Sequence, residues 1–286
     1  MLKNILMKFC IHFLIFLVPF LIPFTGISDS GVFRQQSNIE IKAQLSDHDR
    51  TLHAEMKLEY INNSPDTLRT IYMHLWANAY KNNRTAFAMQ LIENGNYDFH
   101  FASQEDRGGY STIEFESAGK RLSWSNYRGA EDIALLYPDQ PLYPSDTIVI
   151  YIRYTLIFPH ARFSRLGHYN EAFYATQWYP KPAVYDRSGW NPMSYLHRGE
   201  FYSEFGNFQL SLTLPENYIV ASSGVLQNEE EKAFLSQLAL SSYLEGPDIT
   251  DAPDLPPPSS KTTKTLHFHQ ENIHDLTLFP YTTLFR

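Results

Sequence analysis

Apolar and polar residues alternate with a period of two through most of the chain after Asn38. The stretch RTLHAEMKLEYINNSPD, residues 50–66, shows this pattern most clearly. Such alternation predicts an amphipathic strand, because successive side chains of a strand point to opposite faces. The Asn, Pro and Asp residues at 62–66 predict a turn at its end. Five apolar residues share one face of the predicted strand: Leu52, Ala54, Met56, Leu58 and Tyr60.

Two other segments suit helices instead. TAFAMQLIENGN (85–96) predicts a short helix closed by Gly95. LQNEEEKAFLSQLALSSYLEG (226–246) predicts a second helix with Phe234, Leu235 and Leu238 on an apolar stripe. The remaining pattern predicts a mostly all-β fold, an antiparallel β-sandwich or saddle-shaped domain over residues 31–272, with a Pro-rich loop at 246–260. Its further strands are expected within residues 67–80, 111–126, 140–158, 171–180, 207–226 and 265–275.

Composition supports strands and argues against two classes of partner. Aromatic residues make up 15% of the chain, with 19 Tyr and 20 Phe, and these side chains suit a half-buried pleated surface. The formal net charge of −8 gives no support to a nucleic-acid partner. The sequence also contains no Lys/Arg-rich helix of the kind that lies on a membrane surface.

The first residues predict a secretory signal peptide over 1–28. Lys3 and Lys8 precede an apolar run from Phe9 to Phe24, which small and polar residues follow. The chain is therefore expected to be exported and to meet a membrane only through this segment. An uncleaved anchor is the alternative. Cys10 is the only cysteine, so cleavage would leave a chain in which no disulfide forms.

One cluster of metal-ligating residue types occurs near the end of the chain. HFHQENIHD contains His267, His269, His274 and Asp275. His-x-His on a strand places both rings on one face, as in some metal sites, although this spacing is also common by chance. The sequence contains no H-E-x-x-H, G-x-S-x-G, phosphate-binding or dinucleotide-binding motif. These residues alone therefore predict no catalytic centre.

Aromatic and proline residues are concentrated in FYATQWYPKPAVYDRSGWNPMSYL, residues 173–196. This segment contains two Trp, four Tyr and three Pro. A proline-stiffened aromatic loop that leaves a strand can line a recognition surface, because loops on a rigid scaffold carry function. It can equally cover its own sandwich. Both interpretations stay open at this point.

The same segment and two others resemble a known family. NNSPDTLRTIYMHLWANAYKNN (62–83), FSRLGHYNEAFYATQWYPKPAVYD (163–186) and GEFYSEFGNFQLSLTLPENYIVASSG (199–224) resemble the amino-terminal domain of the aminopeptidase N family of zinc metallopeptidases, in its exported Bacteroidetes-type form. The resemblance extends from about residue 31 to about residue 275. It implies a β-saddle domain placed before a thermolysin-like catalytic domain. Together with the signal peptide, it also implies a location in the periplasm or cell envelope of a Gram-negative bacterium, or secretion.

The resemblance also implies roles for individual residues. Thr176–Gln177 match the family's Thr-Gln step in the strand that enters the substrate cleft, so Gln177 is a candidate substrate-binding residue. Tyr179 stands where the family has the Gln or Glu that binds the substrate's amino group, and it is the second candidate. The family's Zn²⁺ ligands and general base come from H-E-x-x-H and a downstream Glu in the next domain, where the bound metal activates water.

None of these catalytic motifs occurs in residues 1–286, and residues 273–276 are expected to begin the missing catalytic domain. The chain is thus expected to be a non-catalytic domain that binds no Zn²⁺, while the parent enzyme binds Zn²⁺ and a peptide substrate. Its expected partner is the catalytic domain in cis. Two alternatives are a stand-alone module that binds peptide or glycan, and a catalytically inactive scaffold relative.

The last ten residues are TLFPYTTLFR, residues 277–286. This peptide is the translation of ACACTCTTTCCCTACACGACGCTCTTCCGA, a common sequencing-adapter string. We therefore expect residues 277–286 to be coded by adapter DNA. A native C-terminal strand is the alternative.

Overall fold

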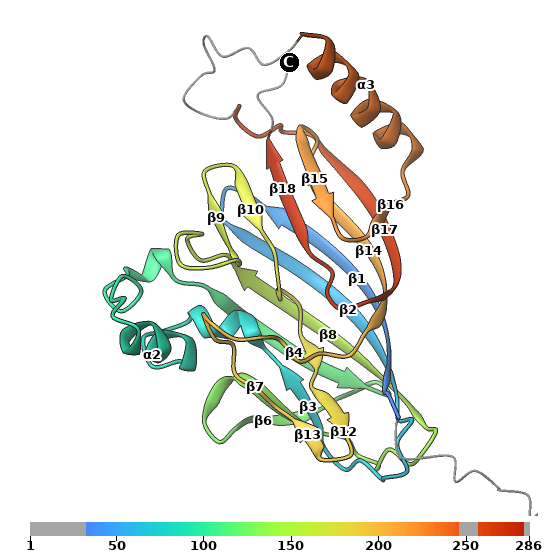
Figure 1. Cartoon of the computed structure of the whole chain (residues 1–286). Coiled ribbons are helices and arrows are strands. Elements are labelled where there is room, and N and C mark those ends of the chain that lie inside the picture. The colour runs from blue at the N-terminus through green and yellow to red at the C-terminus, as the bar shows by residue number, and fades with distance from the viewer. Residues whose placement is uncertain (1–32, 246–256, 283–286) are drawn as a thin grey trace, which may run out of the picture. The chain divides into compact units, whose positions relative to one another are not determined.

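The computed structural model describes residues 33–245 and 257–282 (Figure 1). Its largest element is an eight-stranded sheet with the strand order β16-β17-β14-β1-β2-β8-β4-β5. All neighbouring strands in it are antiparallel except β1 and β14, which are parallel. Its strands are β1 (Gln36–Ser46), β2 (Thr51–Ile61), β4 (Gly109–Ser117), β5 (Lys120–Arg121), β8 (Thr147–Ile157), β14 (Gly206–Pro215), β16 (Val225–Leu226) and β17 (Thr263–Ile273).

Two four-stranded sheets and a two-stranded ribbon complete the β-structure. The first four-stranded sheet has the order β15-β18-β10-β9 and the second the order β11-β3-β7-β6, while β12 pairs with β13. The mostly-β prediction is confirmed. The strands are β3 (Ile71–His74), β6 (Ser123–Tyr127), β7 (Ala130–Tyr137), β9 (Gly167–Tyr169), β10 (Ala172–Tyr174), β11 (Lys181–Pro182), β12 (Val184–Asp186), β13 (Gly189–Asn191), β15 (Tyr218–Ser222) and β18 (Leu278–Thr282).

The long sheet has one apolar face and one polar face. Every second residue of β2 is buried, and these are the five apolar residues whose shared face the sequence predicted. The smaller sheets lie against this face (Figure 1). Ring contacts connect the layers, with centroids 5.2 Å apart for Phe158–Phe173 and 5.5 Å apart for Tyr179–Phe208. A single core therefore forms between the long sheet and the elements on its apolar face.

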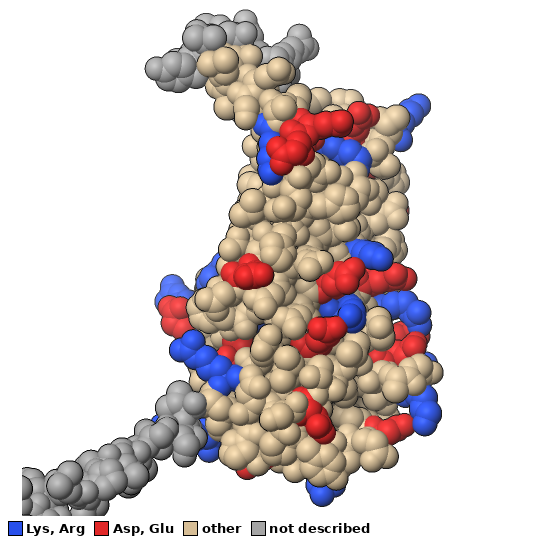
Figure 2. Space-filling model, turned by 90° about the vertical axis from the view of Figure 1, so that its right-hand side faces the viewer, with Lys and Arg blue, Asp and Glu red and all other residues tan. Residues whose placement is uncertain are grey.

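The polar face carries charges of alternating sign in cross-strand rows. In one row, Glu114, Arg153, Glu55 and Lys42 lie opposite one another on neighbouring strands β4, β8, β2 and β1. Opposite charges on facing residues of a sheet attract each other weakly, and like charges repel. On the side drawn in Figure 2, acidic and basic side chains are likewise interspersed, without a field of one sign. This arrangement suits a solvated face.

Both predicted helices form. Helix α2 (Ala86–Glu93) is capped by the Thr85 side chain, which accepts a hydrogen bond from the Ala88 N–H, and Gly95 follows it with a φ of 77°. Helix α3 (Glu229–Glu245) begins with three glutamates, where negative charge suits the helix dipole. The apolar stripe of α3 is partly covered. Phe234 is 48% exposed, whereas Leu235 and Leu238 are half-buried.

Two predicted strands are shorter than their patterns suggest. The segment 67–80 forms β3 and then a 3₁₀-helix, η2 (Trp76–Tyr80), all of whose residues are buried. The segment 171–180 forms only β10 before the chain turns away. Gln177 lies in that turn with a φ of 54°, a left-handed conformation that interrupts pairing. A short 3₁₀-helix, η3 (Gln104–Asp106), precedes β4.

Several predictions lie outside the described residues. These are the signal peptide at 1–28 and most of the Pro-rich loop at 246–260. Within the residues that the structure describes, no helix combines the length and apolar character needed to cross a bilayer. Residues 278–282 form strand β18. The origin of their codons stays a prediction, because strand formation does not depend on where a codon came from.

The two faces of β8 should respond differently to truncation. Ile150 is fully buried, and its neighbour Tyr151 is 50% exposed. We expect Ile150→Ala to lower the free energy of unfolding by about 2–5 kcal/mol through loss of buried contacts and creation of a cavity. Tyr151→Ala is the matched control and should change it by about 0.5 kcal/mol or less. Urea titrations measure both values, and equal losses would contradict the two-faced sheet.

Candidate functional site

A buried carboxylate connects the aromatic segment to the end of β17. Asp275 Oδ1 accepts hydrogen bonds from the Tyr179 hydroxyl at 2.8 Å and from Lys181 Nζ at 2.9 Å. Its Oδ2 accepts a hydrogen bond from the Gln177 backbone N–H at 3.2 Å. Three donors from one short segment thus converge on a carboxylate almost a hundred residues away in the sequence.

The next residue continues the same connection. The Trp178 indole N–H donates to the Leu276 carbonyl at 2.8 Å, and the Leu276 N–H donates to the Tyr179 hydroxyl at 3.3 Å. The Tyr179 hydroxyl therefore donates to one residue and accepts from the following one. We call this set the Asp275 clamp. It consists of Gln177, Trp178, Tyr179, Lys181, Asp275 and Leu276.

The ion pair of the clamp is withdrawn from water. The side chains of Lys181 and Asp275 are only 6% and 9% exposed. The Lys181 ammonium lies 5.3 Å from the ring centroid of Trp76 and 5.1 Å from that of Tyr179, where aromatic faces attract a cation. Burial lowers the pKa of Lys181, and the negative charge of Asp275 opposes that shift. Loss of either partner would leave the other charge buried and uncompensated.

The two residues predicted for substrate binding, Gln177 and Tyr179, both belong to the clamp. Tyr179 is 1% exposed, and its hydroxyl is committed to Asp275 and Leu276. Gln177 is 6% exposed, and no described group pairs with its Oε1. The structure therefore brings the two residues together in the interior. Their role in substrate binding stays a prediction.

Sequence reasoning missed Lys181 and assigned Asp275 only to a histidine cluster. The sequence did contain a signal for Lys181, because this lysine lies between two prolines in the aromatic run WYPKP. A lysine that is buried among such residues needs a carboxylate partner. No local pattern identified the carboxylate. Its partner became visible only when β17 placed the end of IHD beside the aromatic segment.

The histidine cluster does not assemble into a metal site. His267 and His269 share the polar face of β17, as the His-x-His spacing predicted. The His267 Nδ1 lies 3.0 Å from the Ser211 hydroxyl, whereas His274 packs against the Phe205 ring with centroids 5.9 Å apart. Asp275 points into the clamp instead. Within residues 33–245 and 257–282, no group of three or more His, Cys, Asp or Glu side chains could hold a metal ion.

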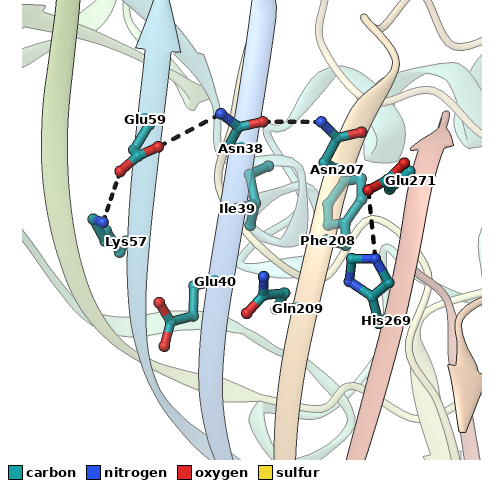
Figure 3. Close-up of a pocket in the computed structure, with 10 residues that line it drawn as sticks. All are labelled: Asn38, Ile39, Glu40, Lys57, Glu59, Asn207, Phe208, Gln209, His269 and Glu271. Carbon is teal, nitrogen blue, oxygen red and sulfur yellow. Dashed lines mark hydrogen bonds and ion pairs between the residues drawn. The ribbon is translucent and has the colours of Figure 1, made fainter. Parts of the chain in front are cut away.

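A shallow polar groove crosses β2, β1, β14 and β17 on the open face of the long sheet (Figure 3). Lys57 Nζ lies 2.7 Å from Glu59, and the Asn38 amide donates to Glu59 at 3.5 Å. The Asn207 amide in turn donates to Asn38 at 3.0 Å. This chain of bonds offers donors and acceptors to solvent or to a polar ligand. It contains no assembled nucleophile and base.

The aromatic segment 173–196 mainly covers the domain's own core. Trp178 is fully buried, and Tyr195 is 1% exposed. Trp190 is half-buried and stacks on Tyr72, with ring centroids 5.3 Å apart. The capping interpretation is therefore confirmed for Trp178 and Tyr195, whereas Tyr174 is 37% exposed and Trp190 is half-buried.

Comparisons with known proteins give similarity in architecture only. No family model matches the chain, and no curated protein matches it. Among solved structures it is similar to an M1 zinc metallopeptidase from Deinococcus radiodurans, with 12% identity and a TM-score of 0.45 over 88% of this chain and 43% of that one. A mutant two-domain M1 zinc metallopeptidase bound to L-arginine gives 14% identity and a TM-score of 0.44 over the same shares. The chain thus spans less than half the length of these structures.

Removing one partner of the clamp's ion pair should destabilise the domain, and the two single losses should not add when both partners are removed. We expect Lys181→Met and Asp275→Asn each to lower the free energy of unfolding by about 3–5 kcal/mol, because each leaves a buried group without its partner. The double variant should lose less than the sum of the two. Lys120→Met is the control, since its exposed pair with Asp139 at 3.2 Å contributes about 0–1 kcal/mol. Additive losses in denaturant titrations would contradict a coupled pair.

A buried histidine beside the clamp should make the domain sensitive to acid. His74 is fully buried, its Nε2 accepts a hydrogen bond from the Met193 N–H at 3.2 Å, and burial lowers its pKa to about 3. Between pH 6.5 and 3 the unfolded state therefore binds more protons at this site than the folded state. We expect stability to fall as the pH decreases through this window.

The variant His74→Gln isolates this contribution, because glutamine can accept the same hydrogen bond but does not titrate. Its free energy of unfolding should depend less on pH between 7 and 4 than that of the original chain. Unfolding curves at several pH values measure the difference. Parallel pH profiles for the two proteins would show that His74 is not responsible.

Proposed function

We propose that this chain is the amino-terminal, non-catalytic domain of an exported zinc-dependent aminopeptidase. Three sequence segments support the proposal, because they match that family's amino-terminal domain in order and together span much of residues 62–224. The observation that carries it is the Asp275 clamp. The clamp joins the Thr-Gln segment to the residues around Asp275. By the resemblance, the first of these lies at the substrate cleft and the second leads into the catalytic domain.

In this proposal the present domain holds part of the cleft wall in place, and the following domain performs the chemistry. A zinc ion in the following domain would activate water for hydrolysis of the peptide's amino-terminal residue. This chain would hold the Thr176–Tyr179 segment rigidly relative to the start of that domain. A segment fixed by several hydrogen bonds and an ion pair keeps its geometry when substrate arrives, which favours a preorganised cleft wall.

Tyr179 would contribute shape rather than recognition of the substrate's amino group. Its hydroxyl already donates to Asp275 and accepts from Leu276, so it has little capacity left for a ligand. Gln177 is the better candidate for contact with a substrate, since its side-chain oxygen has no partner among the described residues. Export through the predicted signal peptide would place the parent enzyme in the cell envelope or outside it.

Two experiments test the proposal: sequencing the genomic DNA beyond the codon for Asp275, and assaying the extended protein. We expect the open reading frame to continue into H-E-x-x-H with a later glutamate. The extended protein should release amino-terminal residues from peptide substrates and lose this activity with a zinc chelator. The present chain with added zinc should show no hydrolysis above background.

Two results would contradict the proposed parent enzyme. A stop codon directly after Asp275 in the genome would favour a stand-alone binding module. A longer reading frame without H-E-x-x-H would favour an inactive scaffold relative. The same reading also decides whether residues 277–286 come from adapter DNA.

A further inference from the structure

A hollow with buried positive charge lies beside the first residue of β4. It has a volume of about 760 Å³ and is lined by the β1–β2 turn, the end of η2 and the segment that joins η3 to β4. Small-molecule sites usually have volumes of about 300–1,000 Å³. Its strongly basic lining residues are Arg50, Lys81 and Arg107. None of the three takes part in an ion pair within the residues that the structure describes. We call this space the Arg107 hollow.

Arg107 is the most deeply buried of these bases. It is 8% exposed, its guanidinium lies 4.7 Å from the ring centroid of Phe99, and its Nη2 donates to the Phe99 carbonyl at 3.0 Å. Its Nη1 is also buried, but no described group accepts a hydrogen bond from it. Burial lowers the pKa of Arg107, although an arginine stays charged at neutral pH. An acceptor oxygen next to Nη1 would therefore stabilise this side chain.

Lys81 supplies a second positive charge, and it is half-buried at the C-cap of η2. Burial lowers the pKa of Lys81, and the negative charge of Glu131 opposes that shift. The Glu131 carboxylate accepts a hydrogen bond from the Asn82 amide at 2.8 Å. Gly109 allows Lys81 to lie close to the backbone, since its φ is 128° and a Cβ at this position would come within 2.9 Å of Lys81 Cγ. The chain at the start of β4 therefore leaves room for the lysine side chain.

The acidic residues of the lining do not neutralise Arg107. The Asp49 side chain is 67% exposed, and its carboxylate is bonded to two side chains of its own segment. Glu105 is exposed as well, and Glu131 acts on Lys81. Salt and water screen exposed charges strongly and buried charges much less. The uncompensated charge on the buried side of the hollow is therefore positive.

We propose that the Arg107 hollow binds an oxyanion, namely the phosphate or carboxylate group of a small ligand. Arg107 and Lys81 donate charge-assisted hydrogen bonds to it, and Arg50 contributes a third positive charge. Side chains hold the anion here, whereas a phosphate-binding loop uses successive backbone N–H groups. This difference explains why no phosphate-binding motif marks the site in the sequence. The inference does not depend on the proposed enzymatic function.

Anion titrations of the full chain test the proposal. Inorganic phosphate and acetate are added separately, while sodium chloride keeps the ionic strength constant and serves as the blank. We expect at least one oxyanion to raise the melting temperature in a saturable manner, by about 3–6 °C at ten times its Kd. The Arg107 side-chain signal in a heteronuclear NMR spectrum should shift with the same Kd. A response to phosphate alone indicates a phosphorylated ligand, and a response to acetate alone indicates a carboxylate.

Matched variants separate binding in the hollow from a general effect of salt. Arg107→Lys keeps the positive charge but lacks Nη1, and it should weaken oxyanion binding by about tenfold or more. Lys81→Met should weaken binding to a similar extent, and it decides the outcome if Arg107→Lys does not fold. Lys120→Met removes an exposed cation outside the hollow and should leave the Kd unchanged. The increment caused by the anion is compared in each protein, because Arg107→Lys also loses bonds to its own loop.

Two results would overturn the proposal. The first is a melting temperature that shows no saturable response to either oxyanion. The second is an equal increment in the original chain, Arg107→Lys and Lys81→Met, since phosphate would then act as a stabilising salt on the whole surface.

Discussion

The buried ion pair between Lys181 and Asp275 is the interaction on which the candidate site depends. It joins two segments that lie far apart in the sequence, and both side chains are almost inaccessible to water. A buried pair of this kind contributes little net stability but makes any arrangement that separates its members costly. Its main effect is therefore specificity, because it selects one relative position for the aromatic segment and the end of β17.

Much of the surrounding structure can be understood from that constraint. Gln177 adopts a left-handed conformation, which is unfavourable for a residue with a Cβ, while its N–H binds Asp275. Trp178 and Tyr179 then enter the core and attach to Leu276. The chain that follows continues into β18, which pairs with β15 and β10. The clamp thus holds both the predicted cleft segment and the chain that leads into β18.

The long sheet gives this site a rigid support with two different faces. Its apolar face packs against the smaller sheets, and its polar face carries opposite charges on neighbouring strands. A one-residue shift of any strand would exchange the two faces and bury the charges. The register is consequently fixed by burial, which is why the eleven-residue alternation of β2 predicted its buried side correctly.

The sequence by itself determined the elements whose signals are local. The alternation in β2, the cap and glycine around α2, and the mostly-β composition each act within a few residues, so they could be interpreted without the fold. The extent to which α3 is buried and the point where the strand at 171–180 ends were not predictable in this way. Whether an apolar face is buried, and where a strand stops, depends on which distant element packs there.

Only the tertiary structure decided the site. Lys181 and Asp275 lie 94 positions apart, and nothing near either residue specifies the other. The sequence indicated Gln177 and Tyr179 through a family resemblance, but it could not show that the Tyr179 hydroxyl is occupied by a carboxylate. Residues so far apart in sequence meet only because the strands between them pair in defined registers, and burial in the core fixes those registers. The contact therefore exists only in the folded chain.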